Sequence, residues 1–125
     1  PEKPCTMIAV IFELWPAPDQ QDRYFDLAAG LRNELQAIDG FVSVERFQSL
    51  AEPGKYLSLS FWRDEATVQA WRNRPAHRGA QQQGRGGVFA DYRLRVAEVR
   101  RDYGLRERVQ APQDANHHHL RQDQP

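Results

Sequence analysis

The sequence predicts an α+β domain in which the elements follow the order β-α-β-β-α-β around one antiparallel sheet, the ferredoxin-like arrangement. Three observations favour it. Four segments are rich in β-branched and aromatic residues, two segments repeat their apolar residues every three or four positions, and Gly, Pro or Asp stands at the changes of period. In this order both helices cover the same face of the sheet, and the other face stays uncovered.

The first strand is expected in MIAVIFELW, residues 7–15, which is followed by Pro16 and Pro18. A helix is expected over 19–40, with Asp19 as its N-cap and Gly40 in the left-handed conformation after its end. Gly30 interrupts this helix and is expected to mark close packing. The buried stripe of the helix comprises Tyr24, Leu27, Ala28, Leu31, Leu35 and Ile38.

The next two strands are expected at FVSVERFQS, residues 41–49, and YLSLSFW, residues 56–62, as a hairpin with a Pro-Gly turn. Asp64 begins a second helix that Pro75 stops, and AHRGAQQQ, residues 76–83, adds a further turn or two. A glycine-rich stretch ends it, and the last strand follows over 88–99. In the third strand the residues alternate between two faces: Leu57, Leu59 and Phe61 against Tyr56, Ser58, Ser60 and Trp62.

One domain accounts for residues 7–104, preceded by an extension over 1–6 and followed by a polar tail over 105–125 that is expected to be disordered or loosely attached. Seventeen basic and 17 acidic side chains give no net charge, so no overall field favours nucleic acid or a membrane surface. A single cysteine, Cys5, and the absence of a signal-like segment favour the cytoplasm. The run His117–His119 lacks partners of fixed geometry, so no metal site is expected.

The stretch AWRNRPAHRG, residues 70–79, holds Trp71 and the one histidine outside the tail, His77. Trp71 is either a core residue or part of a pocket wall, and His77 is either solvent-facing or functional. A neutral imidazole at a pocket mouth would move protons near pH 7. Glu13 and Glu45 lie on strands, where they either face an inner cavity or form ion pairs with Arg46 or Arg93.

Several segments together resemble the antibiotic biosynthesis monooxygenase domain family over about residues 7–103: MIAVIFELWPAP, GFVSVERFQS, KYLSLSFWRDEATVQAW and HRGAQ. The resemblance implies a dimeric α+β barrel with a pocket between the sheet and the helices of each subunit. It also implies cofactor-free oxygenation of phenolic substrates or, in another branch, breakdown of haem.

In the haem-degrading branch an Asn on the first strand, a Trp on the later helix and a His ten residues beyond it carry the reaction. Trp71 stands at the place of the tryptophan, whereas Gln81 stands at that of the histidine and Phe12 or Glu13 at that of the asparagine. Two of the three residues are therefore absent, which disfavours haem breakdown by that mechanism.

We therefore expect a homodimeric, cofactor-independent monooxygenase that uses O₂ and an aromatic or phenolic small molecule, without a metal. The alternatives are a non-catalytic dimer that binds a small ligand, and a haem-binding or haem-degrading relative. His77 and Trp71 are the catalytic candidates. The residues expected to bind substrate are Trp62, Tyr56, Phe12, Phe89 and Gln81.

Overall fold

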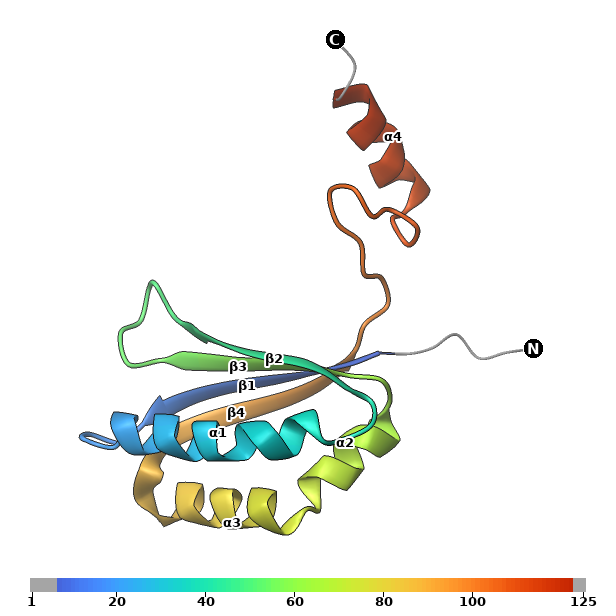
Figure 1. Ribbon diagram of the computed structural model, residues 1–125. Coiled ribbons are helices and arrows are strands. Elements are labelled where there is room, and N and C mark those ends of the chain that lie inside the picture. Colours follow the sequence, from blue (N-terminus) through green and yellow to red (C-terminus); the bar gives the residue numbers. More distant parts are fainter. Residues whose placement is uncertain (1–6, 123–125) are drawn as a thin grey trace.

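The computed structural model describes residues 7–122, without the side chains at positions 76, 80, 81, 83–85 and 118–122. Four strands form one antiparallel sheet in the order β2-β3-β1-β4 (Figure 1). This order and the α+β layering confirm the predicted ferredoxin-like fold. Cys5 lies outside the described residues. The strands are β1 (Ile8–Pro16), β2 (Phe41–Gln48), β3 (Tyr56–Trp62) and β4 (Phe89–Glu98).

The helices that precede β4 all lie on one face of the sheet, here called the inner face (Figure 1). Pro75 ends the second predicted helix as expected, because it begins a separate helix, α3. A five-residue π-helical turn, η1, joins α3 to β4. The helices are α1 (Gln21–Gln36), α2 (Glu65–Arg72), α3 (Pro75–Gln83), η1 (Gly84–Val88) and α4 (Gln113–Gln122).

The start of α1 differs from the prediction. The helix begins at Gln21 with Gln20 at the N-cap position, and no side chain caps it. Asp19 instead has a φ of 65°, in the left-handed region that Asp tolerates better than most residues. A tight turn imposes this conformation: the Ala17 amide donates to the Val88 carbonyl at 2.8 Å, and the Gln20 amide donates to the Ala17 carbonyl at 2.9 Å.

The two glycines of the first helical segment have different roles. Gly40 has a φ of 94°, which confirms its predicted left-handed conformation, and a Cβ there would lie 2.6 Å from Thr67 Oγ1. The expectation that Gly30 marks close packing is wrong, because a Cβ at this position would meet no atom within 4 Å.

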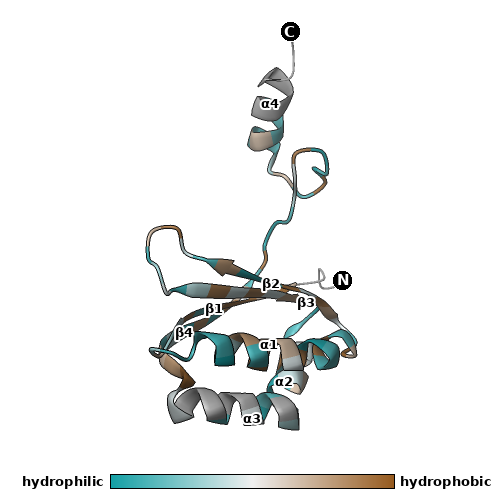
Figure 2. Ribbon diagram, turned by 60° about the vertical axis from the view of Figure 1, so that its left-hand side comes forward, coloured by the Kyte–Doolittle hydropathy of each residue, from teal (hydrophilic) through white to brown (hydrophobic). Residues whose placement is uncertain are grey.

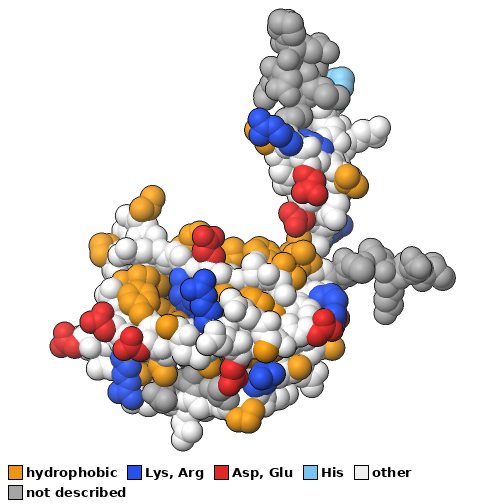
Figure 3. Space-filling view, viewed as in Figure 1, with side chains coloured by type: hydrophobic (Ala, Val, Ile, Leu, Met, Phe, Trp, Pro, Cys, Tyr) orange, Lys and Arg blue, Asp and Glu red, His pale blue; other side chains and the backbone are white. Residues whose placement is uncertain are grey.

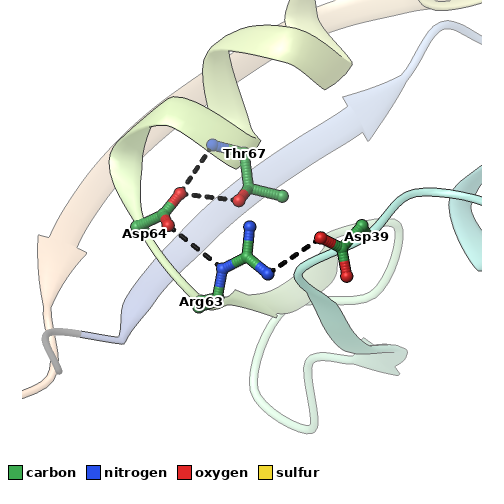
Figure 4. A network of polar contacts seen from close by, with 4 residues as sticks. All are labelled: Asp39, Arg63, Asp64 and Thr67. Atoms are coloured by element: carbon green, nitrogen blue, oxygen red, sulfur yellow. Dashed lines mark hydrogen bonds and ion pairs between the residues drawn. The ribbon is translucent and has the colours of Figure 1, made fainter.

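Asp64 caps α2 as predicted: its Oδ1 accepts from the Thr67 amide at 2.8 Å and from Thr67 Oγ1 at 2.6 Å (Figure 4). Arg63 bridges Asp64 to Asp39, with N···O distances of 3.1 and 3.0 Å. The hydrogen bonds from Thr67 are the main reason why the pKa of Asp64 falls to about 2. This network fixes the start of α2 against the turn that precedes β2.

The core of the domain consists of two clusters between the inner face and the helices. The first contains Ile8, Leu35, Trp62, Val68 and Trp71, and the second contains Leu14, Tyr24, Tyr56 and Val88. Because β1 and β3 pair Ile8 with Trp62 and Leu14 with Tyr56, the clusters lie at opposite ends of these strands. Figure 2 shows apolar residues concentrated in the strands and hydrophilic residues along much of α1.

Glu13 and Glu45 both lie on the outer face of the sheet, so neither carboxylate faces the helices. Glu13 pairs with Lys55 at 2.7 Å and with Arg95, and the hydrogen bonds from these two residues lower the pKa of Glu13. The alternative in which Arg46 or Arg93 pairs with Glu13 is therefore wrong. The strand alternation places Arg46 on the inner face instead.

The chain beyond β4 leads to α4, a helix that the sequence pattern did not predict and that stands away from the sheet (Figure 1). Local polar contacts accompany it: Arg108 donates to Asn116 Oδ1 at 3.0 Å and to the Gly104 carbonyl at 3.1 Å. Within residues 7–122, side chains left out excepted, no group of three or more metal-ligating side chains occurs. In the same part of the chain, every helix is too short or too polar to span a bilayer.

Candidate functional site

A cavity of about 280 Å³ lies between the inner face of the sheet and helices α1, α2 and α3. The cavity lies between the two core clusters. The centres of β1 and β3 line it there with Val10, Phe12, Ser58 and Ser60. Its apolar wall comprises Val10, Phe12, Leu27, Ala28, Leu31, Leu35, Val44, Trp62, Val68, Trp71, Phe89, Leu94 and Val96.

Polar groups are few on this wall. Ser60 accepts a hydrogen bond from the Trp62 indole at 2.9 Å, which satisfies the buried indole N–H. None of the described residues that line the cavity is an Asp or a Glu. The polar lining residues are Tyr24, Arg46, Ser58, Ser60, Arg72, His77 and Tyr92.

Trp71 and His77 both lie on the cavity wall. Trp71 is 8% exposed, and its ring stacks near that of Trp62 with centroids 6.3 Å apart. The helix break at Pro75 brings the His77 ring edge-on to Trp71 at 4.7 Å. Trp71 is therefore both a core residue and a wall of the cavity.

The surroundings of His77 favour the neutral form of its imidazole. Its Nδ1 is buried and has no hydrogen-bond partner among the described residues. Burial lowers the pKa of His77, and the positive charges of Arg78 and Arg72 lower it further. A neutral imidazole has one nitrogen that accepts and one that donates a hydrogen bond, so His77 on the cavity wall can accept a proton from a ligand or donate a hydrogen bond to it.

Arg46 and Tyr24 form the second polar group of the cavity. Arg46 Nε is buried, and no described residue accepts a hydrogen bond from it. Burial raises the pKa of Tyr24 more than the charge and hydrogen bond of Arg46 lower it, so the phenol stays protonated near pH 7.

Of the residues predicted to bind substrate, Phe12, Phe89 and Trp62 line the cavity. Phe12 packs against Phe89 and Tyr92 with ring centroids 5.7 Å apart in both pairs. Tyr56 is not part of the wall, because it is buried against Tyr24 and Phe25. Gln81 belongs to α3, but its side chain lies outside the described residues.

Sequence reasoning did not select Arg46, Tyr24, Arg72 or Tyr92 as site residues. A signal existed for Tyr24, which begins the predicted stripe of α1. Arg46 is the partner of Ser58 in the β2–β3 register, and this register depends on a shift in β2 that the sequence alone does not show.

Comparison with known proteins gives two kinds of match. The family model for antibiotic biosynthesis monooxygenase matches residues 7–83. A protein of Pyricularia oryzae named jasmonate monooxygenase ABM is 53% identical over 93 residues. The match covers 74% of this chain but 43% of that relative, so the chain spans less than half of the relative's length.

Solved structures with the same fold include Rv0793 from Mycobacterium tuberculosis, with a TM-score of 0.70 and 18% identity over 78% of this chain and 99% of that one. A conserved protein from Methanosarcina mazei has a TM-score of 0.68 and 15% identity over 74% of this chain and 92% of that one. At these identities the two structures support the fold and nothing finer.

Proposed function

The chain belongs to the antibiotic biosynthesis monooxygenase family, and from this premise we propose that it transfers an oxygen atom from O₂ to a small molecule in the cavity between sheet and helices. One observation carries the assignment of this site: the imidazole of His77, whose buried Nδ1 has no hydrogen-bond partner among the described residues, lies against Trp71 on the wall of a mostly apolar cavity. Such a site can remove a proton from a bound molecule.

The reaction needs no protein-bound cofactor when the substrate supplies the electrons. A phenol whose ring is oxidised to a quinone gives up four electrons and, with one O₂, yields the quinone and one water. His77 accepts the phenolic proton, which makes the ring electron-rich toward O₂. Trp62, Trp71 and Phe12 hold the ring in an apolar environment.

Jasmonate is a second candidate substrate, because the 53% identical relative is named a jasmonate monooxygenase. Insertion of one oxygen atom of O₂ into a C–H bond of jasmonate releases the other atom as water, so this reaction takes two electrons from an added reductant such as NADPH. The cavity volume of about 280 Å³ lies just below the range of roughly 300–1,000 Å³ typical of small-ligand sites. This size favours a small substrate over a polycyclic one or haem. Non-catalytic binding of the same molecules remains the alternative function.

The test measures O₂ uptake with a panel of phenols, naphthols and jasmonate, each in the absence and presence of NADPH as electron donor, together with calorimetric binding of each compound. We expect O₂ uptake with at least one compound. The His77→Gln variant should take up O₂ roughly 10²-fold more slowly with that compound, while the Kd for the compound changes little. Arg93→Gln, on the outer face, serves as the matched control and should keep the wild-type rate.

Two results would contradict the proposal. Compounds that bind the wild type without any O₂ uptake would support the non-catalytic alternative. Full uptake in His77→Gln would remove His77 as the base. The haem-degrading alternative is tested by adding haem and a reductant and measuring the Soret band over time. If the protein degrades haem, the band should disappear.

A further inference from the structure

The described wall of the cavity carries cations and no anion. Arg46 and Arg72 contribute positive charge, and His77 is the third basic side chain, while the nearby strand carboxylates Glu13 and Glu45 lie on the outer face. A cavity with low-dielectric walls and cations without counter-ions attracts negative charge. The ligand that fits this wall is therefore an anion.

Arg46 is the cation placed to bind that anion. It follows Val44 by two residues on β2, and both side chains line the cavity. Arg63, Arg74 and Arg95 each contact a carboxylate. No described residue offers one to Arg46, whose recorded partner is the hydroxyl group of Tyr24.

An unpaired guanidinium N–H in a buried position destabilises the protein, since it has lost its water without gaining an acceptor. A guanidinium also presents its N–H groups as a planar fork, which matches the two oxygens of a carboxylate better than the single oxygen of a phenolate. Tyr24 and Ser58 add hydroxyl donors, because Tyr24 interacts with Arg46 and Ser58 is its partner in the β2–β3 register.

We propose that Arg46 is the carboxylate anchor of the cavity and that its ligand is a small apolar carboxylic acid, bound as the anion. Arg46 contacts Tyr24 of the second core cluster, whereas His77 contacts Trp71 of the first. A ligand held by its carboxylate at Arg46 therefore directs its apolar end past Trp62 toward His77. Arg46 in this way decides which part of the molecule meets the base.

The inference deepens the proposed function and rests on it in taking the cavity as the substrate site. It also agrees with the name of the Pyricularia relative, since jasmonate is a carboxylate with an apolar body. The simple phenols of the panel lack the group that the anchor recognises, so they should bind more weakly than acids of the same size.

The experiment compares jasmonate with methyl jasmonate, which has the same apolar body and no charge, by titration calorimetry against the full chain. The variants are Arg46→Gln, Arg46→Lys and the control Arg93→Gln, each checked for folding by circular dichroism. We expect the wild type and the control to bind the acid about tenfold or more tighter than the ester. Arg46→Gln should bind both compounds equally, with the affinity for the ester unchanged, and Arg46→Lys should keep part of the preference.

The assignment of Arg46 as the carboxylate anchor is wrong if the wild type binds the ester as tightly as the acid. It is also wrong if Arg46→Gln prefers the acid over the ester as strongly as the wild type does. Failure of both jasmonate and a second acid, 1-naphthaleneacetate, to bind the wild type would overturn it too. The titrations need no turnover. A protein that prefers the acid through Arg46 but consumes no O₂ would therefore contradict the monooxygenase proposal alone.

Discussion

His77 depends on its neighbours for the protonation state that the proposed chemistry needs. The pKa of an unperturbed histidine lies near 6.5, and burial together with Arg72 and Arg78 lowers it in this protein. Trp71 contacts the ring without adding charge. The imidazole is therefore available as a base throughout the neutral range.

The lowered pKa of His77 predicts the acid limb of the pH profile. The activity, measured as kcat/KM, should stay constant as the pH falls to 6.5 and should decline below that value, because the base is then protonated. The same shift makes folding less favourable below pH 6.5, since the unfolded chain binds the proton more readily. A limb at or above pH 6.5, or an identical limb in His77→Gln, would contradict the assignment.

Trp71 and His77 could be selected from the sequence because they share one short stretch with a proline between them. Arg46 could not, because its orientation depends on a register shift in β2 between Phe41 and Ser43. Phe41 packs edge-on against Trp62 on the inner face, so strict alternation from it would place Arg46 outside. A bulge of this kind leaves no reliable mark in a single sequence.

At the scale of the elements, Gly40 and Gly30 offer opposite tests of the fold. Gly40→Ala introduces a Cβ at a φ of 94° and against Thr67, so it should lower the free energy of unfolding by about 1–3 kcal/mol. Gly30→Ala adds a methyl group in open space on α1 and should raise that free energy by about 0.5–1 kcal/mol. Urea unfolding measures both.

A Gly40→Ala variant with the same free energy of unfolding as the wild type would contradict the close approach between the turn before β2 and the start of α2. A destabilised Gly30→Ala would show that α1 has a partner at this position. The pair is matched, since both variants make the same chemical change and differ in backbone conformation and surroundings.

The order and type of the strands and of α1 and α2 followed from the sequence, because a change in hydrophobic period marks each of them, whereas α3 was expected only as a further turn or two of the second helix. The exact starts of elements did not follow. Asp19 has the composition of an N-cap, yet the hydrogen bond between Ala17 and Val88 fixes it in a turn. That contact joins residues 71 positions apart in the sequence, so the helix propensities of neighbouring residues could not predict it.

At the scale of the whole molecule, none of the described helices covers the outer face of the sheet (Figure 1). Ile11, Leu57, Leu59 and Phe61 alternate onto this face and stay only partly buried. Figure 3 shows hydrophobic side chains along the upper side of the domain, away from the helices. An apolar face of this kind favours a partner, and a second copy of the chain is the partner that we propose.

The proposed dimer should sediment at about 29 kDa, twice the 14.5 kDa of the chain, and bury more than ~1,000 Å². Leu59→Arg should shift the protein toward monomer at micromolar concentration. Ala29→Arg, at an exposed position of α1 on the other side of the sheet, also introduces an arginine and should remain dimeric. A wild type that sediments only as monomer would exclude the dimer.

The three tryptophans are divided between the two sides of the sheet. Trp62 and Trp71 line the cavity, whereas Trp15 donates to Glu52 and lies under the Lys55 ammonium group, with 5.1 Å between Nζ and the ring centroid. The cavity thus contains its own fluorophores, and Trp15 emits from outside it as an internal reference. A ligand that displaces water from the inner pair alters part of the emission spectrum, so occupancy of the cavity can be followed optically without a label or a substrate that reacts.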